Sequence, residues 1–178
     1  MACAGTRGGG SESAATVEKA YAPNRLLELG RGYRRSGDAT RAEQYLSAAL
    51  ESRAATPEVR QEALRELLAT CIESQRFRVA VDYAEPELRR RPDDTNLMRL
   101  MATLYAAVGD GLKARETYER LLKMQARDAD AELGLARVLR DAFADRAAAS
   151  EHFERYLEIV PHGPHAVEAR TYLSEAAP

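Results

Sequence analysis

Alanine and leucine recur at fixed positions along the chain, at the spacing of a repeated unit. Four alanines lie 38, 34 and 35 residues apart, at Ala42, Ala80, Ala114 and Ala149. Each is followed eight residues later by a leucine, at Leu50, Leu88, Leu122 and Leu157. Twelve or thirteen residues before each alanine lies another member of the set, at Gly30, Leu68, Ala102 and Ala136. A period of about 34 residues is typical of a helical solenoid.

Within each unit the apolar residues follow the period of an amphipathic helix, and turn residues divide them into pairs. In the first unit the stripe stops at Ser36-Gly37-Asp38, a turn signal. Thr56 and Pro57 supply a cap and a first-turn proline for the second unit. The helices predicted from there on cover residues 57–74, 77–91, 95–108, 111–125, 129–142, 146–160 and 164–176. No segment alternates as a strand would, so the sequence predicts none.

Pro86 falls inside the second helix of the second unit. A proline in a helix interior removes a hydrogen bond and clashes with the preceding turn, at a cost of about 3 kcal/mol or more. We therefore expect this helix to kink or to end early, near residues 82–85.

The repeated set resembles the tetratricopeptide repeat. That family places a small residue and an aromatic on its first helix, then Ala, a large apolar residue and a small residue on its second. The third unit matches at Met98, Met101, Ala102, Tyr105, Ala114, Tyr118, Leu121 and Leu122. The first matches at Leu26, Leu29, Gly30, Tyr33, Ala42, Leu46, Ala49 and Leu50, and the fourth at Ala136, Leu139, Ala149, Phe153, Leu157 and Pro161. The second unit departs most, with Leu68 at a usually small site, and the resemblance covers about residues 23–161.

The resemblance implies an all-α fold, a right-handed superhelical solenoid of about four helix-turn-helix repeats with a C-terminal capping helix. A lone helix pair cannot cover its apolar stripe, whereas stacking buries each stripe against the next pair. In the capping helix we expect apolar residues inward and charged residues outward. The inward ones are Val167, Ala169 and Leu173, and the outward ones are Glu168, Arg170 and Glu175. The repeat domain then spans residues 21–178, and the Gly- and Ser-rich residues 1–20 form a flexible segment.

Composition and charge fit an ordinary soluble protein. Charged residues make up 30% and hydrophobic residues 45% of the 178 positions. The net charge of −2 lacks the basic excess of nucleic-acid binders, so we expect no nucleic-acid partner. No apolar run approaches the roughly 18 residues of a transmembrane helix, and no signal peptide is visible.

The sequence shows no pattern for catalysis or for binding a metal. His152, His162 and His165 lie near one another, but Gly163-Pro164 interrupts any helix between the last two. No cysteine or carboxylate cluster joins these histidines, whereas a structural zinc site takes about four ligands. Gly8-Gly9-Gly10 lacks the Lys-Ser/Thr pair of a phosphate-binding loop. We therefore predict a non-enzymatic protein without cofactor or metal.

In the tetratricopeptide family the first helix of each pair faces a concave groove, and here that face carries arginines. The candidate partner-binding residues are Arg31, Arg34, Arg65, Arg99, Arg137 and Arg140. A guanidinium group can bind both oxygens of a carboxylate. The predicted function is therefore a protein–protein interaction scaffold that holds an acidic or C-terminal segment of a protein or peptide in a basic groove. The other interpretation of these residues is a solvated arginine-rich face. We expect Tyr33, Tyr105 and Tyr118 mainly in packing.

The two cysteines suggest different roles. Ala2-Cys3-Ala4-Gly5 resembles the end of a bacterial lipoprotein signal, whose cysteine becomes lipidated, although the apolar stretch of such a signal is not in the sequence. The alternative function is thus a lipoprotein tethered through Cys3, facing the periplasm and assisting assembly of an envelope complex. Without that lipid we expect a cytoplasmic protein. Cys71 falls on a buried helix face as a free thiol.

Overall fold

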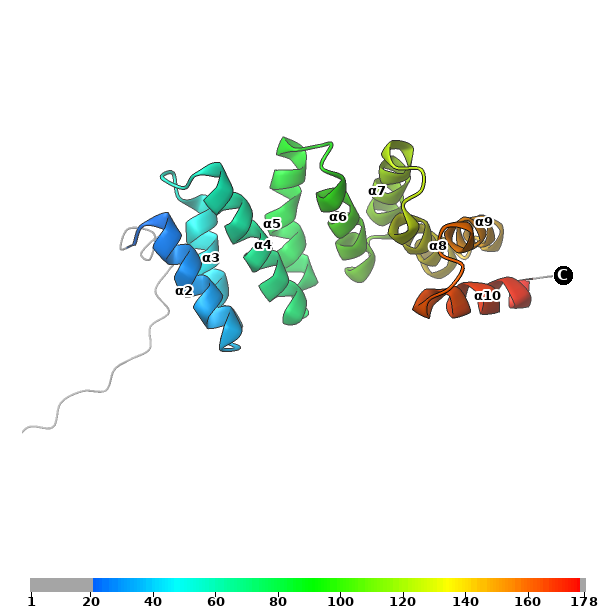
Figure 1. Ribbon diagram of the computed structural model, residues 1–178, viewed down its shortest axis with the longest axis horizontal. Helices are drawn as coiled ribbons and strands as arrows, with labels where there is room; N and C mark the ends of the chain where they lie inside the picture. The colour runs from blue at the N-terminus through cyan, green and yellow to red at the C-terminus, as the bar shows by residue number, and fades with distance from the viewer. Residues whose placement is uncertain (1–20, 177–178) are drawn as a thin grey trace, which may run out of the picture. The chain divides into compact units, whose positions relative to one another are not determined.

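The computed structural model describes residues 21–176, and Figure 1 shows them as α-helices joined by short turns, with no strand in that range. The chain divides into two compact units, Met1–Arg76 and Phe77–Pro178. The first unit holds α2 (Pro23–Arg35), α3 (Ala39–Glu51) and α4 (Pro57–Glu73). The second holds α5 (Phe77–Arg90), α6 (Thr95–Ala107), α7 (Gly111–Met124), α8 (Ala129–Phe143), α9 (Arg146–Ile159) and α10 (Pro164–Ala176). The predicted all-α fold of successive helix-turn-helix repeats is confirmed.

The predictions for residues 1–20 and for Cys3 lie outside the described residues. The flexible N-terminal segment, the lipid anchor and the domain bounds of 21–178 therefore stay predictions.

Within each of the two units, helices that follow one another in the sequence pack together. In the first unit α2 packs against α3, and α4 contacts both. In the second unit α5 to α10 each pack on the next helix along the chain, and α6 also contacts α8. The first helices of successive repeats therefore lie side by side, as α2 with α4 and α6 with α8, which is the arrangement that presents one continuous face in each unit.

Aspartates start most of these helices. The side chains of Asp38, Asp94, Asp110, Asp128 and Asp145 each accept a hydrogen bond from the backbone N–H three residues later. Thr56 does the same for α4, as the sequence predicts. These caps satisfy otherwise unpaired N–H groups, and a carboxylate there also interacts favourably with the helix dipole. Gly37 and Gly109 allow the turns before α3 and α7, because each has φ of +80°.

The repeated alanines lie at the helix contacts. Ala42, Ala80, Ala114 and Ala149 have no exposed surface, and the leucines eight residues later are half-buried. At the crossing of α2 and α3, a β-carbon added to Gly30 would stand 2.5 Å from Leu46 Cγ. Small residues therefore set how closely these helices approach, which explains why the period is visible in the sequence.

The sequence predicts that α5 kinks or ends early near Pro86. The early end is wrong, because α5 continues through Pro86 to Arg90, and the kink stays a prediction. Ala84 before the proline is fully buried and Leu88 after it is half-buried. The backbone N–H of Arg91 still donates to the Glu87 carbonyl at 2.9 Å. Packing on both sides of Pro86 therefore outweighs the one hydrogen bond that the proline lacks.

The predicted orientation of α10 is wrong at two positions. Val167 is 66% exposed, whereas Ala166 and Ala169 are buried, and Ala169 belongs to a core cluster with residues of α8 and α9. The inner stripe of this helix runs through Ala166, Ala169 and Leu173, which places Val167 about 100° away from it. Glu168 does not point to open solvent, because it is paired with arginines of α8.

Candidate binding site for a partner

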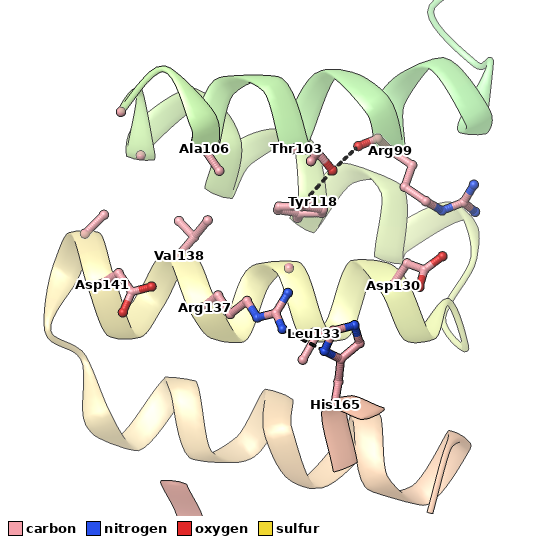
Figure 2. A pocket seen from close by; sticks show the side chains of 14 residues that line it. Arg99, Thr103, Ala106, Tyr118, Asp130, Leu133, Arg137, Val138, Asp141 and His165 are labelled. Carbon is pink, nitrogen blue, oxygen red and sulfur yellow. Dashed lines mark hydrogen bonds between the residues drawn. The ribbon is translucent and has the colours of Figure 1, made fainter. Parts of the chain in front are cut away.

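A cavity of about 510 Å³ lies between α6 and α8 in the second unit (Figure 2). Its walls come from α6 through Arg99, Thr103 and Ala106, and from α8 through residues 130–142. Gly109 in the turn before α7, Gly111 and Tyr118 of α7, and His165 of α10 complete the lining. The cavity thus lies on the face formed by the first helices of two successive repeats, where the sequence predicts a binding groove.

Tyr118 reaches this cavity from the second helix of its repeat. Its hydroxyl lies 3.1 Å from Thr103 Oγ1, which itself donates to the Arg99 carbonyl at 3.0 Å, so the tyrosine is the donor between the two hydroxyl groups. The ring is 4% exposed, and burial raises the pKa of Tyr118, which keeps the phenol neutral. Its predicted role in packing is confirmed, and the same side chain also lines the cavity.

A glycine makes room for this tyrosine. A β-carbon added to Gly134 would stand 2.3 Å from Tyr118 Cζ and 2.5 Å from its hydroxyl oxygen. Any other residue at position 134 would therefore push the ring away from α8. The sequence carries a signal for this contact, a lone glycine inside a helix, where glycine costs roughly 0.5–1 kcal/mol relative to alanine.

Arg99 is held at the start of α8. Its Nε lies 3.1 Å from Asp128 Oδ2, and its Nη1 donates to Asn96 Oδ1 at 3.1 Å. Asp128 also caps α8 by accepting from the Ala131 N–H at 3.0 Å. Burial disfavours ionisation of Asp128, but the bonds from Arg99 and Ala131 outweigh burial, so the pKa of this carboxyl is lowered. The ion pair joins the first helices of two repeats.

Arg137 and Arg140 share a second carboxylate. Glu168 Oε1 accepts from Arg137 Nε at 3.1 Å and from Arg140 Nη1 at 3.0 Å. Hydrogen bonds from Arg137 and then Arg140 lower the pKa of Glu168 to about 2, although burial opposes the shift. Arg140 also donates to Asp141 Oδ1 at 2.6 Å. The two predicted contact arginines of α8 therefore fasten α10 to α8.

The first unit repeats this arrangement between α2 and α4. Arg31 and Arg34 each lie 2.9 Å from a carboxylate oxygen of Glu66. Arg31 is also paired with Glu62, and Arg34 with Glu73 at 2.5 Å. Glu62 in turn pairs with Arg65 on its own helix.

The structure therefore brings the predicted arginines together in groups, but each guanidinium already has a carboxylate partner within the chain. The sequence analysis missed these partners, which are Glu62, Glu66, Glu73, Asp128, Asp141 and Glu168. A signal was present, because Arg31, Arg99 and Arg137 precede their partners by about one repeat. Arg65 is the most exposed of the six, with 69% of its side chain accessible.

Cys71 is a free, buried cysteine of the first unit. Burial raises the pKa of the Cys71 thiol to about 11, so this cysteine is no thiolate nucleophile at neutral pH. Among residues 21–176, no three His, Cys, Asp or Glu side chains come together as metal ligands. In the same range no helix has the length and apolar character needed to cross a membrane.

Three solved structures resemble this chain over most of its length. A tetratricopeptide repeat protein from Parabacteroides merdae is 20% identical, with a TM-score of 0.74 over 86% of this chain and 59% of that one. MamA is 17% identical, with a TM-score of 0.70 over 86% of this chain and 89% of its own. YrrB, described as a TPR protein with an unusual peptide-binding site, is 16% identical, with a TM-score of 0.71 over 89% and 81%.

Sequence similarity is confined to part of the chain. No family model matches. Cellulose synthase operon protein C of Pseudomonas fluorescens is 34% identical over 85 residues, which cover 48% of this chain. The chain matches 7% of the length of that protein. Together, the packing of the helices and these structural likenesses show that the chain has the fold of the tetratricopeptide repeat proteins.

Proposed function

We propose that this chain is a non-enzymatic interaction scaffold that binds a peptide or a protein segment on the face formed by the first helices of its repeats. The observation that carries the proposal is the cavity of about 510 Å³ between α6 and α8. Its size falls within the range of about 300–1,000 Å³ that is usual for ligand pockets. Its lining combines small apolar side chains with polar groups, as sites that fix the orientation of a ligand do.

Ion pairs within the chain hold the helices that line the cavity together in the absence of a partner. Asp128 ties Arg99 of α6 to the start of α8, and Glu168 ties α10 to Arg137 and Arg140. A site whose side chains are already ordered loses less conformational entropy on binding. The arginines therefore support binding first by positioning the helices that line the site.

The chemistry of the lining favours recognition over catalysis. The Thr103 hydroxyl is bonded to a backbone carbonyl and the Tyr118 phenol stays neutral, so neither is an activated nucleophile. YrrB, whose solved structure has a similar fold, is described as having a peptide-binding site. This likeness supports a peptide or protein as the ligand class.

A cavity-filling variant tests the proposal. A library of random peptides displayed on phage is selected on the purified chain, and enriched peptides are synthesised for titration. Ala106→Arg places a long side chain in the cavity, and we expect it to weaken peptide binding by tenfold or more. Ala107→Arg is the matched control, because Ala107 is also exposed and adjoins Ala106 but does not line the cavity. Failure to enrich any peptide, or equal binding by the two variants, would contradict the proposal.

The sequence predicts an acidic or C-terminal ligand for the whole arginine-lined groove, and we propose such a ligand here for the first unit alone. Arg65 has the most accessible side chain of the six predicted contact arginines, and Glu62 on the same helix is its ion-pair partner. Such an exposed pair contributes little to stability, so Arg65 is free to exchange its partner. We expect Arg65→Glu to weaken binding of a peptide that carries a carboxylate at this site, with an unchanged helical circular-dichroism spectrum. Arg53→Glu, in the exposed turn after α3, serves as the control for net charge.

A further inference from the structure

We infer that the segment bound in the cavity of the second unit carries a basic side chain, lysine or arginine, which pairs with Asp130. The inference rests on the proposed function and adds the chemistry of the ligand. It follows from the charges around the cavity, from the bonds that already occupy its arginines, and from the place of Asp130 along the cavity.

Carboxylates outnumber guanidinium groups around this cavity. The guanidinium groups of the cavity and its walls belong to Arg99, Arg137 and Arg140, and the carboxylates to Asp128, Asp130, Asp141 and Glu168. All of these except Asp130 take part in an ion pair within the second unit. Asp130 is exposed and lines the cavity, and it forms no ion pair with any residue in 21–176. The uncompensated charge of the site is therefore negative.

The arginines that could attract an anion are already bonded. Arg99 donates to Asp128 through Nε and Nη2, to Asn96 through Nη1 and to Gln125 through Nη2. Its charge influences Asp130 only at longer range, beyond an ion-pair distance.

Arg137 is bonded in the same way. It donates to both oxygens of Glu168 and, at 3.0 Å, to His165 Nδ1. Because arginine has no acceptor, His165 Nδ1 accepts this bond and leaves its Nε2 as the free donor of the ring. The positive charges of Arg99 and Arg137 are therefore already balanced by carboxylates of the chain, whereas the negative charge of Asp130 is not, so the site favours a cation over an anion.

Asp130 and a group of small and apolar side chains lie toward opposite ends of the cavity. Figure 2 shows Asp130 at one end, beside the start of α8, and Val138 and Ala106 toward the other, where the carboxylate of Asp141 is paired with Arg140. Gly109, Gly111 and Ala142 add further small residues to the lining. Lysine and arginine have long apolar stems that lie along such surfaces while the charged head reaches a polar end. The shape of the cavity therefore suits a basic side chain next to an apolar one.

Asp130 also lies in the first turn of α8, where the helix dipole favours a carboxylate. This effect accounts for a small gain in stability, but it concerns the folded chain alone and predicts no change in the affinity for a peptide. A binding experiment therefore separates the two roles of Asp130.

The test uses the phage-displayed random peptides of the selection above on the full chain. We expect the enriched sequences to share a lysine or arginine next to an apolar residue. Asp130→Asn should lower the affinity for the synthesised peptide roughly fivefold, because an exposed ion pair is lost. Added salt should lower the affinity of the wild-type chain more than that of the variant, because it screens this ion pair. Asp93→Asn is the control, because Asp93 is exposed in the same unit and does not line the cavity.

A double-mutant cycle makes the outcome specific. Replacing the basic residue of the peptide by glutamine should lower its affinity for the wild-type chain. The same replacement should change the affinity for the Asp130→Asn variant only slightly. Enrichment of acidic peptides, or an equal cost of the glutamine peptide with both chains, would overturn the inference and leave the proposed function standing. If the wild-type chain enriches no peptide at all, both fail together.

Discussion

The ring of Tyr118 lies across the backbone of Gly134, so close that a β-carbon on the glycine would stand 2.3 Å from the tyrosine Cζ. Tyr118 belongs to α7 and Gly134 to α8, so this contact joins the second helix of one repeat to the first helix of the next. It also sets one boundary of the cavity, because both residues line it. The stability of the second unit and the shape of its cavity therefore depend on the same pair.

Gly134→Ala should destabilise the chain, although alanine is the better helix former. The added methyl group forces the Tyr118 ring to move, and overpacking of this kind costs about 1–3 kcal/mol. Urea unfolding of the two proteins measures the difference. Thr103 should lose its hydrogen bond to Tyr118 at the same time, so peptide binding to the cavity should weaken.

A second glycine provides the control for Gly134→Ala. Gly32 lies within α2, and a β-carbon there would meet no atom within 4 Å. Gly32→Ala should therefore stabilise the chain by roughly 0.5–1 kcal/mol. If both substitutions stabilise equally, the contact between Tyr118 and Gly134 does not exist in solution.

Much of the fold could be predicted from the sequence, because its determinants are local and repeat. The alanine period fixes where helices touch, and Thr56 and Pro57 mark where α4 starts. The helix ends agree with the predicted ones within a residue or so. The full length of α5 could not be predicted, because the local cost of Pro86 competes with the burial of Ala84 two residues earlier, which depends on tertiary packing. Val167 was misjudged because two rotations of α10 bury apolar residues, and only the packing on α8 and α9 decides between them.

The candidate site was harder to predict, because its chemistry arises between repeats. The sequence placed Arg99 and Arg137 on the lining, which the structure also shows. It did not show that Asp128 and Glu168 would form ion pairs with these two arginines, because each carboxylate lies about 30 residues further along the chain, at the start of α8 or on α10. For the same reason the sequence did not indicate Asp130 as a residue of the site. The role that we infer for Asp130 depends on the ion pairs that its neighbours form, and these pairs join residues that are far apart in the sequence.

Glu168→Gln should destabilise the second unit by about 1–2 kcal/mol at pH 7, since two arginines lose a charged partner. The pKa of Glu168 is lowered from 4.5 to about 2 in the folded chain, so its ionised form stabilises the fold. Because the folded pKa lies below the unfolded one, this contribution is complete above about pH 4.5 and is lost as the pH falls toward 2. Urea midpoints of both proteins across that window measure the effect.

Glu151→Gln is the control for this pH dependence. Glu151 is 66% exposed and pairs with Arg155 one turn away on α9, where an ion pair is worth little. Its midpoint should follow the wild type at every pH. A gap between wild type and Glu168→Gln that stays constant down to pH 2 would contradict the pairing of Glu168 with Arg137 and Arg140.

Ala114→Trp tests the assignment of the repeated alanines to helix contacts. Ala114 has no exposed surface, so a tryptophan there must displace neighbouring helices, at a cost of about 1–3 kcal/mol or more. Thermal melting followed by circular dichroism should show a lower midpoint. Glu116→Trp, an exposed site two residues along the same helix, should leave the midpoint within a degree or two. Equal melting of the two variants would refute the role of the alanine period.

Glu132 and His152 form a buried polar pair between α8 and α9 that the sequence did not reveal. His152 Nδ1 lies 2.5 Å from Glu132 Oε2, and the Glu132 side chain is 5% exposed. A buried carboxylate without a partner loses its hydration and gains nothing in return, which costs about 1–3 kcal/mol. We therefore expect His152→Ala to lower the free energy of unfolding by that amount in urea titrations at pH 7.

Two further variants show whether the effect of His152→Ala comes from the pair. The double variant Glu132→Gln/His152→Ala removes the buried charge as well, so it should recover part of the lost stability. His162→Ala is the control for loss of a histidine, because His162 is exposed in the turn before α10. If the double variant is less stable than His152→Ala alone, the cost lies in lost packing around the imidazole, and Glu132 does not depend on His152 as its partner.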